Sequence, residues 1–329
     1  MKRREALAAL VALACAGLGT EAHPNGADRR IGFLYGRGKP AKPGADPYLE
    51  AFVGGLRELG FVEGKNLHIE WRYADGDYQR HTAQAADLAA LKVEVIVTSS
   101  LPSTQAAMRA TRAIPVVFAA MVDPVGTGTV KALARPEGNV TGFSLMSLDL
   151  VPKQLEMLRE VQPKLKRVSL LINPAVAVHK TFLAKAQSVA QKLGIAILPV
   201  EASRPEEVER GFAAMAAWDT QAVIMPTDSF FNGNKKQIAQ LALKHRIIAM
   251  LPHSADAEAG ALLSYGPDLV ANYRQAAGYV AKILMGAKPG DLPVVQPMFF
   301  QLGVNLGTAK TLGIKIPQSL LLSANEVIE

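Results

Sequence analysis

Short apolar runs alternate along this chain with amphipathic stretches long enough for several helical turns. Runs rich in Val, Ile and Leu are typical of buried parallel strands, and amphipathic stretches are typical of helices that cover a sheet. The alternation predicts an α/β fold of doubly wound parallel sheets with helices on both faces. In the first part of the chain, the expected strands are "IGFLYG" from Ile31, "NLHIEWRYA" from Asn66, "VEVIVTSS" from Val93 and "PVVFAAM" from Pro115.

Helices are expected between these strands, and the same plan repeats after Ser144. The first helices are Tyr48 to Leu59, Tyr78 to Leu91 and Ser103 to Thr111. The second set of strands is "RVSLLIN" from Arg167, "IAILPVEA" from Ile195, "AVIMPTD" from Ala222 and "IIAMLP" from Ile247. Its helices are Leu150 to Val161, Val178 to Leu193, Pro205 to Trp218 and Lys235 to Lys244. There follow "ALLSYG" from Ala261, a helix from Val270 to Met285 and the loop "GAKPGDLP".

The chain is larger and more apolar than a single core requires. Its 329 residues are 49% hydrophobic, so two lobes of ordinary domain size are expected. The single cysteine, Cys15, lies near the N-terminus, so the rest of the chain can form no disulfide and offers no thiol for catalysis or metal binding. The six histidines lack the spacing of a metal site, and neither a metal nor a cofactor is expected.

Residues 1–22 have the features of a secretory signal peptide. Three basic residues at positions 2–4 precede an apolar run from Ala6 to Leu18 that is too short to span a bilayer. Cleavage after Ala22 would yield a periplasmic protein. Two alternatives stay open: the adjacent arginines permit export by the twin-arginine route, and Cys15 would be acylated in a lipoprotein.

Charge and motifs argue against two classes of function. The formal net charge of +7 is mild for this length, and no aromatic residues interleave with a basic run, so no nucleic-acid surface is expected. Neither a G-x-S-x-G elbow, an H-E-x-x-H helix nor a complete G-x-G-x-x-G loop is present. Asp75 and Asp77 resemble a carboxylate pair, but their spacing favours a turn that caps the following helix.

Several segments, in order along the chain, carry a resemblance to a known family. They are "EAFVGGLRELGFVEGKNLHIEWRYADGD", "VVFAAMVDPVGTG", "GALLSYGPD", "ILMGAKPGDLP" and the tail "LPVVQPMFFQLGVNLGTAKTLGIKIPQSLLLSANEVIE". Together they span nearly all residues after about Arg30. In these segments the chain resembles the ABC-transporter substrate-binding proteins of the tryptophan/tyrosine-binding type.

The resemblance implies a periplasmic binding protein-like fold of type I. Two lobes would be joined by three crossovers that act as a hinge, with the ligand cleft between them. Lobe 1 would comprise 30–144 plus 254–288, and lobe 2 would comprise 145–253 plus 289–329. The hinge candidates are 141–144, 252–254 and 288–292.

Ligands of open parallel sheets bind beyond the carboxyl ends of the strands, and this rule selects the candidate residues of lobe 1. Ser99 and Ser100 precede an expected helix, whose first amides and hydroxyls could hold a carboxylate. The alternative is that they only cap that helix. Asp123 could accept from a ligand ammonium or cap the helix after it. Tyr35, which ends the first strand, could form an aromatic wall or pack in the core.

Lobe 2 offers a second set of strand-end residues. Asn173 and Thr227 each follow an expected strand, and Asp228 is the first choice for an ammonium partner, with turn formation as the alternative. Phe230 and its neighbour could form an aromatic wall, although one of the two is expected to pack inside the lobe. Tyr265, near the end of "ALLSYG", could complete the wall or belong to the core.

These features favour an extracytoplasmic solute-binding protein that performs no chemistry. It would close around a small ligand, an aromatic amino acid or related aromatic carboxylate, and deliver it to an ABC permease in the inner membrane with a cytoplasmic ATPase. A monomer without a nucleic-acid partner is expected. Two alternatives stay open: a periplasmic ligand sensor that docks on a receptor, and a secreted enzyme on a doubly wound fold.

Overall fold

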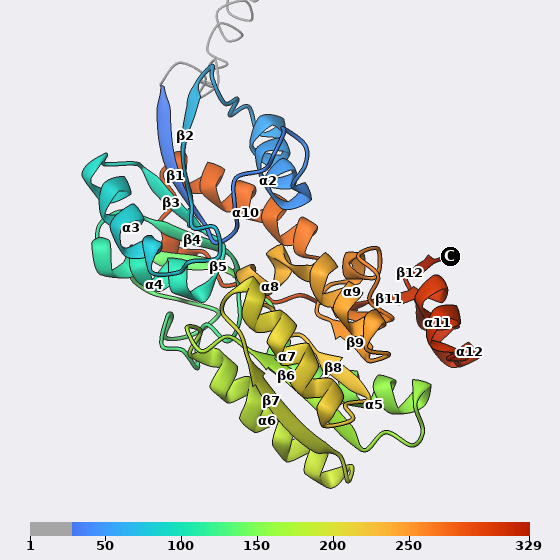
Figure 1. Ribbon diagram of the computed structural model, residues 1–329. Helices are drawn as coiled ribbons and strands as arrows, with labels where there is room; N and C mark the ends of the chain where they lie inside the picture. The colour runs from blue at the N-terminus through green and yellow to red at the C-terminus, as the bar shows by residue number, and fades with distance from the viewer. Residues whose placement is uncertain (1–27) are drawn as a thin grey trace, which may run out of the picture.

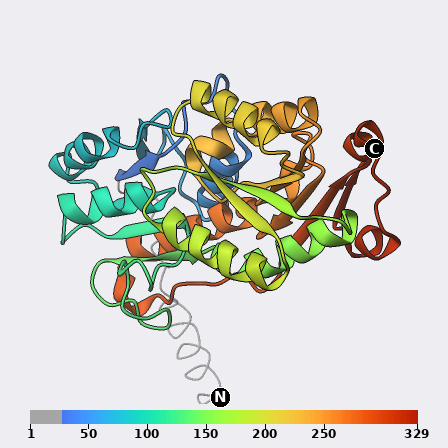
Figure 2. The same ribbon diagram turned by 60° about the horizontal axis from the view of Figure 1, so that its bottom comes forward.

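The structure is a computed structural model that describes residues 28–329. The expected signal peptide at 1–22 and its Cys15 lie outside the described residues. The described chain forms two α/β lobes, each built on its own sheet (Figures 1 and 2). Within residues 28–329, no helix is both long and apolar enough to cross a bilayer.

The first lobe contains a five-stranded sheet in the order β2-β1-β3-β4-β5, and every pairing in it is parallel. Its strands are β1 (Arg29–Tyr35), β2 (Leu67–Tyr73), β3 (Val95–Thr98), β4 (Val116–Met121) and β5 (Val140–Ser144). Ile31 of β1 lies between Ile69 of β2 and Val95 of β3, and all three are buried. The apolar runs of the sequence are thus central strands covered on both faces.

Helices cover both faces of this sheet. They are α2 (Pro47–Glu58) and α10 (Leu269–Leu284) on one face, and α3 (Arg80–Ala90) and α4 (Leu101–Ala110) on the other. Phe33 packs on Phe52 of α2, with ring centroids 5.1 Å apart, whereas its neighbour Gly32 faces Leu88 of α3. Gly55 allows α2 and α10 to approach closely, because a Cβ there would lie 2.9 Å from the Cβ of Ala277.

The second lobe contains a seven-stranded sheet in the order β12-β11-β10-β9-β8-β6-β7, in which only the β10–β11 pairing is antiparallel. Its strands are β6 (Arg167–Ile172), β7 (Ala196–Glu201), β8 (Ala222–Ile224), β9 (Ile248–Leu251), β10 (Leu263–Gly266), β11 (Gln301–Asn305) and β12 (Glu326–Ile328). Its helices are α5 (Ser147–Val161), α6 (Val178–Lys192), α7 (Pro205–Ala217), α8 (Ser229–Gly233), α9 (Lys235–Lys244), α11 (Leu306–Leu312) and α12 (Gln318–Ser323).

Alternate residues of β8 divide the core of this lobe into two. Ala222 and Ile224 belong to a cluster with α5, α6, α11 and α12, whereas Val223 belongs to a cluster with α7, α8 and α9. The second sheet is therefore also covered on both faces, as the strand–helix alternation predicts. The C-terminal elements β11, β12, α11 and α12 lie at its outer end (Figures 1 and 2).

Two predicted boundaries between the lobes, after residues 253 and 288, differ from the structure. Residues 254–288 were expected in lobe 1, yet β10 pairs with β9 and β11 in the second sheet. Only α10 returns to the first lobe, where it packs against α2 and β4. An apolar run predicts a strand but not its neighbours, because strand partners are chosen by packing over the whole lobe.

The chain passes between the lobes three times, although not at the expected hinge segments. Residues 141–144 belong to β5 of the first sheet, and 252–254 follow β9 within the second lobe. The passages lie between β5 and α5, between β10 and α10, and after Val295, which still bridges Phe143 of β5. The short 3-10 helix η2 (Pro289–Asp291), in the third expected segment, contacts β5 and so stays with the first lobe.

Candidate ligand-binding cleft

A cleft of about 590 Å³, including its mouth, lies between the lobes at the carboxyl ends of strands from both sheets. From the first lobe, Tyr35 ends β1, and Ser99 and Ser100 follow β3. From the second lobe, Asp228 follows β8 and His253 follows β9. The cleft thus occupies the position where open α/β sheets bind their ligands.

Tyrosines form much of the cleft wall. Four of the seven tyrosines of the chain line it, and they are Tyr35, Tyr48, Tyr78 and Tyr273. The rings of Tyr48 and Tyr273 stack with centroids 5.4 Å apart, and Tyr35 meets Tyr273 edge-on at 6.4 Å. Burial raises the pKa of all four, so their hydroxyls stay protonated at neutral pH and can donate. This wall suits a ligand with a flat apolar ring.

Arg37 brings a positive charge to the cleft, but that charge is already balanced. Its guanidinium pairs with Asp46 and lies over the rings of Tyr35 and Tyr48, at 5.4 and 5.0 Å from their centroids. Burial by itself would lower the pKa of Arg37, but the neighbouring Tyr35 and Asp46 outweigh it and raise the pKa. Asp46 also accepts from the Tyr35 hydroxyl at 2.6 Å, so this corner is fully paired.

Ser99 and Ser100 line the cleft where α4 begins. Ser99 Oγ accepts from the Gly36 amide at 2.9 Å and donates to the Leu34 carbonyl at 3.3 Å, which ties β3 to the end of β1. Ser100 caps α4 in a capping box with Ser103. Ser100 therefore both caps α4 and lines the cleft. The N-terminus of α4, which is the positive end of the helix dipole, lies at the cleft.

Asp228 is the carboxylate of the cleft. One oxygen caps α8 by accepting from the Phe231 amide at 2.8 Å. The other accepts from the Tyr78 hydroxyl at 2.9 Å and from the side-chain Nδ2 of Asn173 at 3.4 Å. The same Tyr78 hydroxyl accepts from the Phe230 amide at 3.0 Å. Tyr78 belongs to the first lobe, so this cluster joins the two lobes across the cleft.

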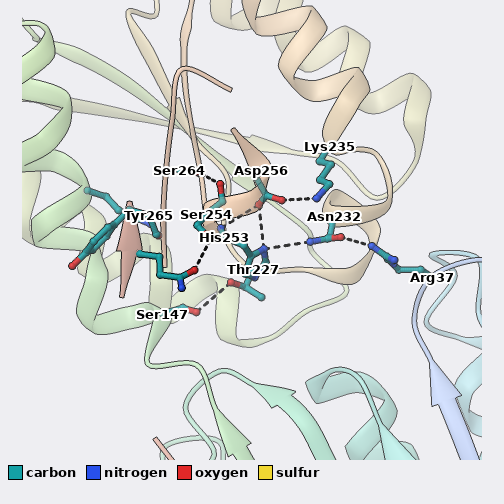
Figure 3. A network of polar contacts seen from close by, with 12 residues as sticks. Arg37, Ser147, Thr227, Asn232, Lys235, His253, Ser254, Asp256, Ser264 and Tyr265 are labelled. Atoms are coloured by element: carbon teal, nitrogen blue, oxygen red, sulfur yellow. Dashed lines mark hydrogen bonds and ion pairs between the residues drawn. The ribbon is translucent and has the colours of Figure 1, made fainter. Parts of the chain in front are cut away.

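A second polar connection crosses the cleft from Arg37 (Figure 3). The Arg37 guanidinium donates to Asn232 Oδ1 at 2.5 Å, and Asn232 Nδ2 lies 3.3 Å from His253 Nδ1. His253 Nδ1 is also 3.1 Å from Asp256, whose carboxylate pairs with Lys235 at 2.7 Å. Burial alone would raise the pKa of Asp256, but His253 and Lys235 outweigh it and lower the pKa.

Two glycines allow the lobes to touch beside the cleft. A Cβ on Gly36 would lie 2.6 Å from Ser229 Oγ, and a Cβ on Gly76 would lie 3.2 Å from the Phe230 ring. Both glycines belong to loops of the first lobe, whereas Ser229 and Phe230 begin α8 of the second. The loops therefore rest directly on α8.

Sequence comparison places the chain in a family. The profile of the family described as "ABC transporter substrate binding protein" matches residues 41–328, most of the chain. The protein is an ABC transporter substrate-binding protein. Proteins of this family bind solutes outside the cytoplasm and work with an ABC permease; the family is not one of enzymes.

The substrate-binding protein is also similar to proteins of known sequence or structure. It is 27% identical over 274 residues, 83% of this chain and 78% of the relative, to the tyrosine-binding protein of Clostridioides difficile R20291. A Vibrio cholerae conserved domain protein is 28% identical, with a TM-score of 0.82 over 92% of this chain and 99% of that one. The resemblance to the tryptophan/tyrosine-binding type and the type I-like α/β fold are thus confirmed.

Two solved structures show which arrangement of the lobes is present here. The Streptococcus pneumoniae ABC domain in complex with L-Trp, 25% identical, superposes with a TM-score of 0.82 over 92% of this chain and 100% of that one. The ligand-free, open structure of a Clostridium difficile substrate-binding protein, 28% identical, reaches only 0.62 over 91% and 99%. The chain thus superposes better on the structure with L-Trp than on the open one, and hydrogen bonds from Tyr78 to Asp228 and from Arg37 to Asn232 join its two lobes in a closed arrangement.

Four predicted site residues do not line the cleft. Asp123 instead accepts from the Gly126 amide at 2.9 Å within a turn, and because β5 is the next element, the helix that it was predicted to cap does not form. Asn173 donates a hydrogen bond to Asp228 but does not itself line the cleft. Phe230 packs in the core of the second lobe, and Tyr265 packs against Phe300. Tyr265 does not line the cleft because its strand, β10, pairs within the second sheet. Phe230 does not line it because α8 begins at Ser229 and turns the Phe230 ring towards the core of the lobe.

The remaining five predicted residues do line the cleft, and as ligand contacts they stay predictions: Tyr35, Ser99, Ser100, Thr227 and Asp228. Sequence reasoning missed seven other polar or aromatic lining residues, which are Arg37, Tyr48, Tyr78, Ser229, Asn232, His253 and Tyr273. Arg37 and His253 each follow the end of a strand by two residues, so the strand-end rule could have selected them. No local signal marks Tyr48 or Tyr273, which reach the cleft from helices.

Proposed function

We propose that this substrate-binding protein captures an aromatic amino acid by closing its lobes and hands it to an ABC permease of the inner membrane, energised by a cytoplasmic ATPase. The observation that carries the proposal is the composition of the cleft. A tyrosine-rich wall adjoins one carboxylate, Asp228, and the start of one helix, α4. An amino acid with an aromatic side chain offers the complementary ring, ammonium and carboxylate.

Each polar end of such a ligand has a partner of opposite character. Asp228 can accept from the ammonium, since a carboxylate has more acceptor sites than the bonds from Phe231 and Tyr78 occupy. The ligand carboxylate fits the hydroxyls of Ser99 and Ser100 and the dipole of α4. Arg37 is left out of this scheme, because Asp46 already neutralises it.

Lobe closure couples binding to recognition by the permease. The bonds from Arg37 to Asn232 and from Tyr78 to Asp228 join residues of different lobes, so they exist only while the lobes are closed. A ligand that contacts both lobes shifts the open–closed equilibrium by the difference between its affinities for the two states. The permease would then recognise the closed form.

The proposal includes export to the periplasm. The basic and apolar pattern of residues 1–22 supports a cleaved signal peptide, with lipidation at Cys15 as the alternative. The released chain would work as a monomer.

A ligand screen of residues 23–329 tests the proposal. The protein is unfolded and refolded to remove carried-over ligand, and its melting temperature is measured with tryptophan, tyrosine, phenylalanine, their deaminated acids, aliphatic amino acids and sugars. A ligand at about 100 times its dissociation constant adds about 2.7 kcal/mol, a shift of several degrees. Stabilisation by aromatic amino acids above all others is expected. Stabilisation only by sugars or aliphatic amino acids would refute the proposal.

A further inference from the structure

A second cavity, a groove of about 730 Å³ including its mouth, lies beside the chain that joins β5 to α5. One wall is the turn after β4 in the first lobe, which contributes Val125. The other wall belongs to the second lobe, where α5 contributes Leu148 and α6 contributes Thr181. The groove, like the cleft, is therefore bounded by both lobes.

The first crossover, residues 145–146, separates this groove from the cleft. Leu145 lines the cleft, whereas its neighbours Ser144 and Met146 line the groove. The same change of side occurs after β4, where Val122 lines the cleft and Asp123 lines the groove. The two cavities thus lie back to back, on opposite sides of a chain segment that joins the lobes.

This arrangement couples the widths of the two cavities. Lobes that turn as rigid bodies about a connection between two cavities change both cavities at once. Opening of the cleft on one side of the first crossover narrows the groove on the other side, and closure of the cleft widens it. An object that keeps the groove wide therefore opposes opening of the cleft.

Apolar side chains in the groove favour the opposite change. Val125 is 43% exposed, and Met146 and Leu148 are half-buried. Narrowing of the groove would remove part of their surface from water, which stabilises the open lobes. The balance between open and closed lobes thus depends on the groove as well as on the cleft.

We propose that this groove controls closure: an occupant that fills it favours the closed lobes and so raises the affinity of the cleft for its ligand. The occupant blocks narrowing, and it covers the apolar side chains that opening would otherwise bury. The inference deepens the proposed function and rests on capture by closure, but not on the identity of the ligand. The gain in affinity is at most the reciprocal of the fraction of ligand-free protein that is already closed.

Thiol labelling of the folded protein tests this control. Residues 23–329 contain no cysteine, so Thr181→Cys places a single thiol at an exposed position of α6 in the groove. Methanethiosulfonate reagents attach a methyl, a propyl or a benzyl group. Solution X-ray scattering without ligand measures the closed fraction, and calorimetry measures the affinity for tyrosine. From methyl to benzyl, the closed fraction should rise and the dissociation constant should fall roughly threefold to tenfold.

Ser188→Cys is the matched control. Ser188 lies two turns further along α6, is also exposed and does not line the groove, so its labels should change neither quantity. Val125→Cys, on the opposite wall, should repeat the effect of Thr181→Cys. The labels are also applied to Thr181→Cys/Tyr78→Phe, which lacks one bond between the lobes and opens more readily. There the benzyl group should recover part of the lost affinity, even if the unaltered protein is already largely closed without ligand.

The failures of the two proposals differ. A closed fraction in Thr181→Cys/Tyr78→Phe that stays constant or falls with the size of the label would overturn control by the groove and leave the proposed function standing. Equal effects of the labels at positions 181 and 188 would do the same. A closed fraction that rises with label size, together with no binding of any aromatic amino acid, would support control by the groove and overturn the proposed function.

Discussion

The hydroxyl of Tyr78 donates a 2.9 Å hydrogen bond to the carboxylate of Asp228, and these two residues belong to different lobes. Asp228 at the same time caps α8, and the Tyr78 hydroxyl accepts from the Phe230 amide. Burial, followed by the charge of Asp228, raises the pKa of Tyr78, so the hydroxyl remains a donor. Closure of the cleft is thus linked to the residue proposed to hold the ligand ammonium.

Tyr78→Phe should weaken ligand binding by loosening the closed state. The change removes one partner from Asp228 and one from the Phe230 amide, a loss of about 1 to 2 kcal/mol, or roughly five- to thirtyfold in the dissociation constant. Calorimetry measures the affinity, and solution X-ray scattering measures the closed fraction. Tyr73→Phe is the control, because Tyr73 lies on β2 outside the cleft. Equal affinities for both variants would contradict the role of Tyr78.

Gly36→Ala should hinder closure without harming the lobes. The new Cβ would lie 2.6 Å from Ser229 Oγ and 2.7 Å from Ser229 Cβ, which both belong to the other lobe. We expect at least a tenfold loss of affinity, an open shape in solution scattering with ligand present, and little change in the melting temperature of the free protein.

The double variant Gly36→Ala/Ser229→Gly removes the facing side chain and should restore affinity. Gly54→Ala is the matched control, because a Cβ at that helical position meets nothing within 4 Å. It should leave binding unchanged and raise the free energy of unfolding by up to about 1 kcal/mol. A failure of the double variant to recover affinity would argue against steric contact between Gly36 and Ser229.

Asp228→Asn separates the charge of this residue from its structural roles. The amide oxygen can still cap α8, and the NH₂ group that replaces the other oxygen can donate to the Tyr78 hydroxyl, but the negative charge is lost. Affinity for aromatic amino acids should fall roughly tenfold to a hundredfold, whereas affinity for their deaminated acids should hold or improve. Asp123→Asn, outside the cleft, should bind like the unaltered protein. Parallel losses for both ligand classes in Asp228→Asn would rule out an ammonium contact.

The stability of the first lobe should depend on pH through His81. Burial lowers the pKa of His81 from 6.5 to about 4, so between these values the unfolded chain binds a proton that the folded chain does not. Stability is therefore fully present above pH 6.5 and falls as the pH drops towards 4, by about 3 kcal/mol in total.

His81→Phe should reduce this decline in urea unfolding measured from pH 7 to 4. The ring would still stack on Tyr78, which His81 meets at 5.9 Å. His245→Phe is the matched control, because His245 stacks on Phe212 in the same way but is partly exposed. Unchanged pH dependence in His81→Phe would show that another group causes the decline.

Much of the architecture can be predicted from the sequence, because the residue patterns of strands and helices are local. Apolar runs such as that from Ile31 mark buried parallel strands, and their carboxyl ends predict where Tyr35, Ser99 and Asp228 lie. The rule holds for these residues because parallel strands end at one common edge. It fails for Tyr265, since the partners of β10 depend on contacts with β9 and β11 that no local pattern encodes.

The pattern of apolar and polar residues by itself determines the α/β class and the two sheets covered by helices. Burial imposes a regular spacing of apolar residues along each strand and helix, and this spacing is present in the sequence. Tertiary structure alone decides the composition of the cleft. Tyr48, Tyr78 and Tyr273 converge from separate helices and loops, and Arg37 meets Asn232 across 195 positions of sequence. Such long-range contacts depend on how whole lobes pack and close. The free energy of packing and closure comes from residues far apart in the chain, so no local pattern reveals it.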